Sequence, residues 1–214
     1  MKAIVLAMAT VAALASSPVY AANLLVNGDF EASTSPTTTP TGWTNVGHSD
    51  GVIPYTIGPV PAYDGNYFYD LGGYGDASGP VGDGIQQAVA TIVGAAYTLT
   101  FGLSSEDVSG QTVLLVSIGG QNTPFLLTAG GTYFLKGFTT QTINYVATSS
   151  STLISFIEQV NMSGGNNDPM IDGVIFSPAA GGVPEPATWA MMVLGVGFVG
   201  GALRSRRKVS VSYA

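Results

Sequence analysis

The chain has 214 residues, of which 29 are glycine and none is cysteine, and only 9% are charged. Between Ala22 and Gly182 it carries twelve acidic residues and one lysine, Lys136, which gives a formal net charge of −11. This balance argues against a nucleic-acid partner, because phosphate binding requires clustered Lys and Arg side chains, and it makes cations the natural small ligands.

The first 21 residues have the three parts of a secretory signal peptide. Lys2 supplies the positive charge, an apolar run covers Ala3–Ala15, and Val-Tyr-Ala at residues 19–21 fits the small-x-small cleavage rule. We therefore predict a signal peptide helix over residues 1–21, which is removed after Ala21, and an exported protein.

Residues 22–180 are rich in glycine and contain short runs of alternating or β-branched residues separated by turn sequences. This pattern predicts one all-β domain, a β-sandwich or jelly roll, with a polar surface loop at 33–41. Strands are predicted, in chain order, at 23–26, 42–46, 52–57, 66–71, 84–90, 96–103, 112–118, 124–127, 133–138, 141–147, 152–160 and 171–176.

Five segments of this domain resemble a galactose-binding-like jelly roll, the fold of several families of carbohydrate-binding modules. The resemblance spans residues 23–177 and implies a jelly-roll β-sandwich in which Trp43 anchors the core. The segments are Asn23-Leu-Leu-Val-Asn-Gly-Asp-Phe-Glu31, Gly42-Trp43, Asp83-Gly-Ile-Gln-Gln-Ala-Val89, Tyr97-Thr-Leu-Thr-Phe101 and Met170-Ile-Asp-Gly-Val-Ile-Phe176.

The same resemblance implies a structural calcium ion that bridges the first and last strands. Glu31 and Asp172 stand at the matching positions, and the turn that begins at Asp64 would add further oxygen ligands. Calcium takes roughly six to eight oxygen ligands, so carboxylates and carbonyls suit it. The alternative is that the same side chains accept hydrogen bonds at strand ends.

Tyrosines gather between residues 55 and 74, and Tyr63, Tyr67 and Tyr74 are the candidates for sugar binding. A flat aromatic ring buries the apolar face of a sugar while nearby polar groups bind its hydroxyls. The alternative is structural, because the alternation in Tyr67-Phe68-Tyr69 distributes these rings over the two faces of a strand.

Catalytic chemistry has little support in the sequence. His48 is the only histidine and no cysteine is present. His48 lies in a polar turn, Gly47-His-Ser-Asp-Gly51, and no Gly-x-Ser-x-Gly elbow occurs elsewhere in the chain, which disfavours a catalytic triad and a zinc site. A glycosidase needs two carboxylates at a fixed separation, but Glu106 and Asp107 fit a solvated turn and Glu158 fits a strand end. We predict that the protein is not an enzyme.

Residues 181–208 form a three-part segment. Val-Pro-Glu-Pro ends at Pro186, an uncharged and mostly apolar run covers Thr188–Leu203, and a basic cluster follows. As a helix the apolar run is about 24 Å long, shorter than a hydrocarbon core of ~30 Å. The basic cluster consists of Arg204, Arg206, Arg207 and Lys208.

This segment resembles the PEP-CTERM sorting signal, a tail also called the ice-binding protein C-terminal domain. The resemblance implies that an exosortase-type membrane protease recognises Pro184, Glu185 and Pro186, and that a transmembrane helix anchors the protein until processing. The alternative is a permanent single-pass anchor. Residues 209–214 form a tail with no assigned role.

We therefore predict an exported protein that is membrane-anchored until processing and is then located at the cell surface or outside the cell. Its predicted role is non-enzymatic, as a structural or adhesive component associated with exopolysaccharide. The alternative is a lectin-like module that recognises an extracellular polysaccharide.

Overall fold

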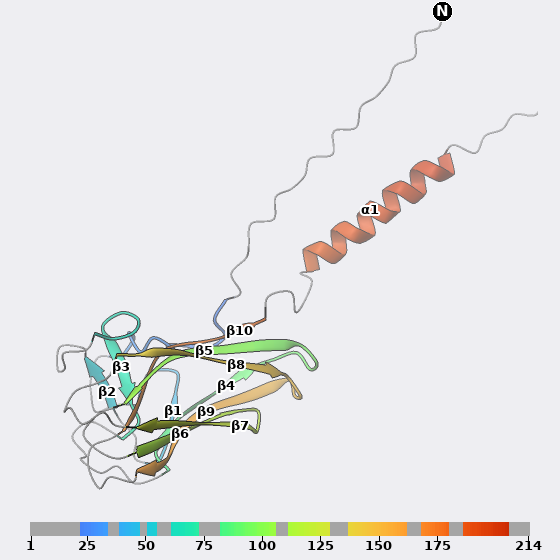
Figure 1. The fold of residues 1–214 in the computed structure, drawn as a ribbon. Coiled ribbons are helices and arrows are strands. Elements are labelled where there is room, and N and C mark those ends of the chain that lie inside the picture. The colour runs from blue at the N-terminus through green and yellow to red at the C-terminus, as the bar shows by residue number, and fades with distance from the viewer. Residues whose placement is uncertain are drawn as a thin grey trace, which may run out of the picture.

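The computed structural model describes residues 22–33, 39–47, 51–54, 61–72, 82–105, 111–128, 137–161, 168–179 and 186–205. Within these ranges the chain forms ten strands and one helix, α1 (Figure 1). Their bounds are β1 Thr44–Val46, β2 Gly51–Pro54, β3 Tyr67–Asp70, β4 Gly84–Ala90, β5 Ala96–Ser105, β6 Gln111–Ile118, β7 Gln121–Thr128, β8 Thr139–Val146, β9 Ser151–Asn161, β10 Pro169–Pro178 and α1 Pro186–Ser205.

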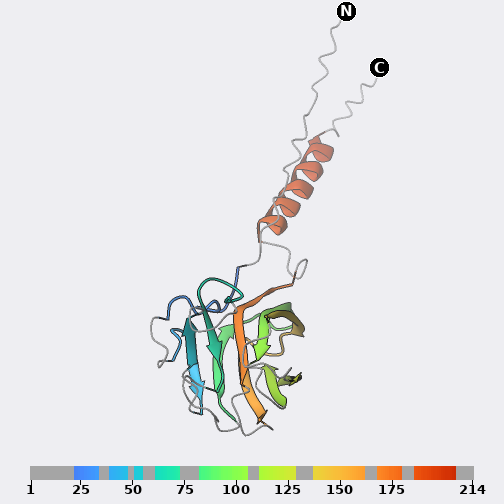
Figure 2. The same cartoon turned by 60° about the vertical axis from the view of Figure 1, so that its left-hand side comes forward.

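The strands build two antiparallel five-stranded sheets that lie as separate layers (Figures 1 and 2). Sheet A has the order β1-β4-β9-β6-β7, and sheet B has the order β2-β3-β10-β5-β8. Strands β3 to β10 contribute four neighbours to each sheet, in the order of a jelly roll built from two Greek keys. Strands β1 and β2 extend one edge of each sheet. The predicted jelly-roll sandwich is confirmed.

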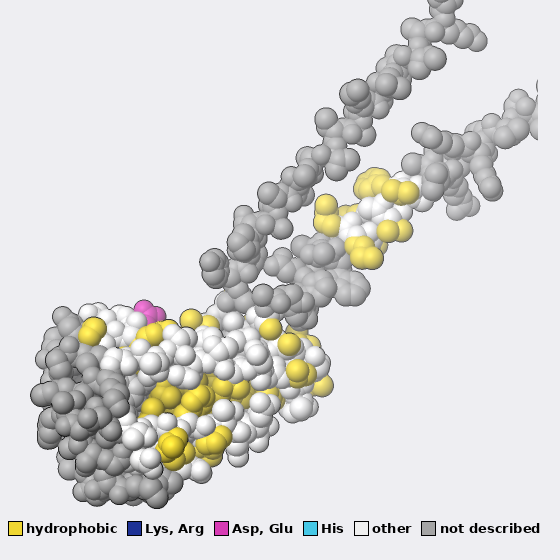
Figure 3. All heavy atoms as spheres, in the orientation of Figure 1, with side chains coloured by type: hydrophobic (Ala, Val, Ile, Leu, Met, Phe, Trp, Pro, Cys, Tyr) yellow, Lys and Arg dark blue, Asp and Glu magenta, His cyan; other side chains and the backbone are white. Residues whose placement is uncertain are grey.

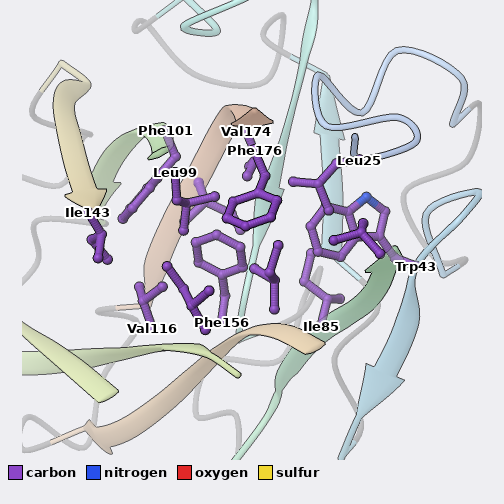
Figure 4. Packing of buried hydrophobic residues seen from close by; sticks show 14 of the residues in the cluster. Leu25, Trp43, Ile85, Leu99, Phe101, Val116, Ile143, Phe156, Val174 and Phe176 are labelled. Carbon is purple, nitrogen blue, oxygen red and sulfur yellow. The ribbon is translucent and has the colours of Figure 1, made fainter. Parts of the chain in front are cut away.

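The core lies between the two sheets because alternate residues of each strand point inward. In β6 every second residue is buried, and Leu114, Val116 and Ile118 are among them. Phe156 of sheet A packs against Phe101 of sheet B with ring centroids 5.2 Å apart. Figure 4 shows the inward-pointing side chains of both sheets meeting in this space.

Trp43 has the anchoring position that the sequence predicted. Its side chain is 6% exposed and belongs to the main core cluster. Its ring lies against Phe30 and Phe156 (Figure 4 shows Trp43 beside Leu25). The indole Nε1 donates a hydrogen bond of 3.0 Å to the main-chain oxygen of Asn27, so the one polar atom of the buried ring is satisfied.

The strand predicted at 23–26 is not formed, and side chains explain why. A single backbone hydrogen bond of 2.8 Å joins Leu24 N to Phe176 O of β10. The side-chain amide of Asn23 makes the neighbouring bonds, because its Nδ2 donates to Val174 O and its Oδ1 accepts from Phe176 N. The side chain of Gln87 likewise bonds both the N–H and the carbonyl of Val26. The segment is thereby held to both sheets without strand pairing.

The remaining strand predictions agree with the structure to different degrees. The bounds predicted for β4 are those observed, and most other strands differ only at their ends. Residues 55–57 and 133–136, which were predicted to be extended, lie outside the described ranges. Residues 137 and 138 precede β8 and are not strand.

The C-terminal apolar run lies in α1, a helix of 20 residues that Figure 1 draws outside the sandwich. Among the described residues, no helix is both long enough and apolar enough to cross a membrane. The predicted transmembrane helix is therefore not found there. The uncharged part of α1 ends at Leu203, because Arg204 follows. The predicted signal peptide and the tail at 209–214 lie outside the described residues.

Candidate binding surface

An exposed aromatic ring lies on the outer face of sheet B. Tyr63 belongs to the loop before β3 and is 43% exposed. Its ring covers Gly102 of β5 and Gly173 of β10, and a Cβ built on Gly102 would come within 2.6 Å of the ring's Cγ. Only glycine at these two positions lets the ring lie against the sheet backbone.

The position of this ring is fixed by its neighbours. The Tyr63 hydroxyl forms a hydrogen bond of 2.7 Å with Thr140 Oγ1 on β8. Phe138 flanks the ring with a centroid separation of 6.2 Å. Phe138 also packs on Phe68 and Met170, which form a second, small hydrophobic cluster. Tyr63 is therefore held in place before any ligand binds.

A shallow pocket of about 300 Å³ adjoins this ring. Asp64 follows Tyr63 in the chain, and Gly173 contacts its ring, so both of these lining residues border the ring. The exposed carboxylates of Asp29 and Asp64 give the pocket an acidic character. The full lining is Asn23, Leu25, Asn27, Gly28, Asp29, Asp64, Gly173, Val174 and Ile175.

The amides in this pocket have structural roles. Asn23 bonds the backbone of β10 through both of its side-chain atoms, and Asn27 donates to Ser33 Oγ and Thr41 O. The carboxylates of Asp29 and Asp64 are exposed, and Asp29 Oδ1 also accepts a long hydrogen bond of 3.4 Å from Glu31 N. On the face shown in Figure 3, the described atoms include one small acidic spot and no basic side chain.

The structure brings the three predicted calcium ligands to one turn, residues 64–66. Glu31 Oε1 accepts hydrogen bonds from the main-chain N–H groups of Asn66 and Tyr67, the latter at 2.7 Å. Asp172 Oδ2 accepts from Asp64 N at 2.9 Å. Asp172 thus bonds the start of the turn and Glu31 bonds its end, which are contacts of the kind that the hydrogen-bonded alternative predicts.

The hydrogen bonds at this turn occupy oxygen atoms that a calcium ion would need as ligands. The oxygens of Glu31 and Asp172 already face N–H donors, including Gly173 N on Asp172 Oδ1 at 2.6 Å. Among the described residues, no group of three or more His, Cys, Asp or Glu side chains is arranged to hold a metal ion. Calcium bound by Glu31, Asp64 and Asp172 stays a prediction.

Asp172 lies on β10 and is fully buried, with 0% of its surface exposed. Burial is the main cause that raises the pKa of Asp172 to about 7, and the negative charge of Asp64 adds to it. The hydrogen bonds from the backbone at Asp64 and Gly173 lower the pKa and oppose these effects. Glu158 on β9 is a second buried acid and is also 0% exposed. Its pKa is raised to about 7 by burial and by the negative charge of Asp83.

The sequence did not single out Glu158 and Asp83 as a buried pair. The signal was present, because Ile154, Phe156 and Glu158 are alternate residues of β9 and share its inner face. A carboxylate in that series predicts either a strand end in water or a buried acid. The structure shows a buried acid, which accepts a hydrogen bond of 3.0 Å from Thr112 Oγ1.

Of the three predicted sugar-binding tyrosines, only Tyr63 has been placed on an exposed face. Tyr67 is half-buried and packs against the main core, on the same side of β3 as the fully buried Tyr69. Tyr67 thus does not share the exposed outer face on which Tyr63 lies, and sugar contact by Tyr67 stays a prediction. Tyr74 lies outside the described residues, as do Pro184 and Glu185 of the sorting motif. Pro186 begins α1.

Fold and surface together define a jelly-roll module with an exposed aromatic ring beside an acidic pocket. Residues 23–177 match the family described as "Protein of unknown function (DUF642)", and the chain belongs to this family. Residues 182–208 match the PEP-CTERM protein-sorting motif. This confirms the sorting signal predicted from the sequence. No curated protein matches the chain significantly.

Several solved structures resemble the chain in fold. TmCBM61 in complex with beta-1,4-galactotriose is 19% identical, with a TM-score of 0.47, over 73% of this chain and 99% of that chain. A family 35 carbohydrate-binding module from Clostridium thermocellum is 14% identical, with a TM-score of 0.43, over 64% of this chain and 92% of that chain. At such low identities and TM-scores, the likeness does not indicate what this chain binds.

The two raised pKa values predict an unusual pH dependence of stability. A carboxyl group with a raised pKa in the folded state stabilises the fold fully below its unfolded pKa, and this contribution is lost as pH rises through the folded pKa. In the presence of a chelator, the free energy of unfolding is expected to fall as pH rises from about 4, the ordinary pKa of a solvated carboxyl group, to about 7, the raised pKa of both groups. The loss is on the order of 3 kcal/mol per group.

Urea unfolding across this pH range measures the effect. Glu158→Gln serves as the matched variant, because glutamine cannot ionise and should remove one of the two contributions to the slope. A free energy of unfolding that rises with pH throughout the same range would contradict the burial argument.

Proposed function

We propose that the domain is an exported, non-enzymatic module that binds an extracellular polysaccharide at the outer face of sheet B. The observation that carries this proposal is the ring of Tyr63. It is 43% exposed, it rests on the backbone at Gly102 and Gly173, and it is tethered to Thr140. A ring held in this way needs no ordering when a ligand stacks on it, which lowers the entropic cost of binding.

The neighbouring groups suit a sugar. The apolar face of a pyranose ring stacks on an aromatic ring, and its hydroxyls donate to carboxylates at the edge. Asp29 and Asp64 supply such acceptors in the adjoining pocket. The pocket is shallow, which suits a polymer that lies across a surface better than a small molecule that must be enclosed.

The domain charge narrows the class of polysaccharide. A formal net charge of −11 between residues 22 and 182 repels polyanions. A neutral polysaccharide is therefore the expected ligand, and acidic polysaccharides are expected to bind only when a divalent cation screens the repulsion.

A non-enzymatic role is supported by where the perturbed acids lie. Glycoside hydrolysis needs a carboxylic acid with a raised pKa in contact with the substrate. The two described carboxyls whose pKa rises to about 7, Glu158 and Asp172, are 0% exposed. They do not reach a polysaccharide chain.

The C-terminal motif supports the place of action. The protein carries a PEP-CTERM sorting motif over residues 182–208. We infer that an exosortase-type protease processes this segment at Pro184, Glu185 and Pro186, and that the domain then acts at the cell surface or in extracellular polysaccharide.

A polysaccharide-binding panel tests the proposal. The full chain is incubated with neutral, acidic and amino-sugar polysaccharides, and with the exopolysaccharide of the producing cells, in calcium and then in chelator. Saturable binding to a neutral polysaccharide is the expected result. Absence of binding to every polysaccharide in both conditions would overturn it and leave a structural matrix component as the role.

A further inference from the structure

A group of polar side chains points into the sandwich at one end of sheet A. Asp83 lies two residues before the buried Ile85 of β4 and is 3% exposed, so it lies on the inner side of the sheet. It faces Glu158 across the β4–β9 pair, because Glu158 N donates to Asp83 O at 2.9 Å and Gly82 N donates to Glu158 O at 2.8 Å. The two carboxylates are therefore neighbours in the interior.

Asn45 of β1 joins this group from the sheet edge. It pairs with Ile85, which is fully buried, and directly paired residues share one face of a sheet. Asn45 is thus on the same inner face as Asp83 and Glu158. Gly47, two residues after Asn45, lies against Asp83, because a Cβ built on Gly47 would overlap the carboxylate of Asp83.

Two oxygen atoms in this group are buried without a hydrogen-bond donor. They are Oδ1 of Asn45 and Oε2 of Glu158. The other oxygen of Glu158 accepts from Thr112 Oγ1 at 3.0 Å. Buried oxygens without donors are rare in folded proteins, because desolvation then goes uncompensated.

The negative charges of Asp83 and Glu158 are a second reason to expect a bound proton or cation. Two neighbouring buried carboxylates repel each other, and each loses its hydration. The chain between Ala22 and Gly182 has a single basic side chain, Lys136, for twelve acidic ones. A proton or a bound cation would compensate the negative charge at this end of the sheet.

We propose that a divalent calcium ion binds inside this end of the sandwich, ligated by Oε2 of Glu158, the carboxylate of Asp83 and Oδ1 of Asn45. The donors are all oxygen, two of them formally charged, which is the set that a hard divalent cation prefers. Main-chain carbonyls or water complete the roughly six to eight ligands that calcium takes. Zinc does not suit the site, because it prefers nitrogen and sulfur ligands.

The bound ion ties three strands together. Asn45 belongs to β1, Asp83 precedes β4, and Glu158 belongs to β9, and these are consecutive neighbours in sheet A. The site is distinct from the turn at residues 64–66, where Glu31 and Asp172 accept hydrogen bonds from N–H groups. It also does not depend on the polysaccharide proposal.

Thermal unfolding of the full chain in calcium and in chelator tests the site, at about pH 8, where Glu158 would be ionised. Saturating calcium is expected to raise the melting temperature of the wild type by about 5–10 °C. Glu158→Gln should abolish most of this rise. In chelator the same variant should be as stable as the wild type or more so, because it removes the repulsion with Asp83.

Two further variants keep the result decisive. Asn45→Ala, which changes no charge, should weaken calcium binding about tenfold in a calorimetric titration, since it removes one ligand. Asp172→Asn should leave the rise unchanged. A wild-type melting temperature that is equal in calcium and chelator overturns the proposal and leaves a shared proton as the partner. A rise that survives Glu158→Gln but disappears in Asp172→Asn overturns it in favour of the 64–66 turn.

Discussion

Replacing Tyr63 by alanine is expected to weaken polysaccharide binding by about ten- to a hundredfold. The physical reason is the loss of a flat, half-exposed ring that Gly102 and Gly173 support from below and that Thr140 holds in one orientation. Stacking area at the centre of a contact surface contributes more than the polar contacts around it. The measurement is an affinity for the polysaccharide that binds best to the wild type.

Two matched variants separate binding from folding. Tyr63→Phe keeps the ring and loses only the hydrogen bond to Thr140, so its affinity should fall by about fivefold or less. Tyr67→Ala removes a ring of the same type that packs against the core instead. It should lower stability while the folded fraction binds normally. An unchanged affinity in Tyr63→Ala would place the binding surface elsewhere on the domain.

Replacing Phe156 by alanine is expected to lower the free energy of unfolding by about 3–5 kcal/mol. Phe156 is 0% exposed and lies between the sheets, where its ring contacts Phe101 of sheet B and Trp43. Alanine leaves a cavity that rings from both sheets line, and rigid rings collapse poorly into such a space. Urea unfolding at a single pH measures the change.

Leu126→Ala provides the control for this core substitution. Leu126 is also apolar and also lies in sheet A, but it is 62% exposed on β7. Its replacement should change stability by about 0.5 kcal/mol or less. Similar losses for Phe156→Ala and Leu126→Ala would mean that the two sheets do not pack through the cluster that Figure 4 shows.

Local sequence features predicted the fold well where a strand buries one face. The run Gly84–Ala90 alternates and lies between turn residues, and its predicted bounds are those of β4. The sequence at 23–26 has strand-like composition, yet it forms no strand. Leu24 N donates one backbone hydrogen bond to Phe176 O of β10, and the side chain of Gln87 bonds both the N–H and the carbonyl of Val26. A contact between residues 61 positions apart leaves no local pattern.

Part of the candidate site was predictable because it depends on composition and on short motifs. The sequence by itself determined the acidity of the domain, the sorting motif at residues 182–208 and the presence of a tyrosine-rich segment. The resemblance to a galactose-binding-like jelly roll implied that Glu31, Asp64 and Asp172 meet, and the structure joins them at one turn. Composition and short motifs carry such information because they do not depend on distant parts of the chain.

Only the tertiary structure decided which tyrosine faces a ligand and which acids are buried. Tyr63 is exposed because glycines at positions 102 and 173, on two other strands, let its ring lie on the sheet. Glu158 becomes a candidate ligand only because Asp83 and Asn45 share its inner face through the β1-β4-β9 pairing. Exposure, pKa and ligand geometry arise from groups that are far apart in the sequence, so they follow from packing and not from local pattern.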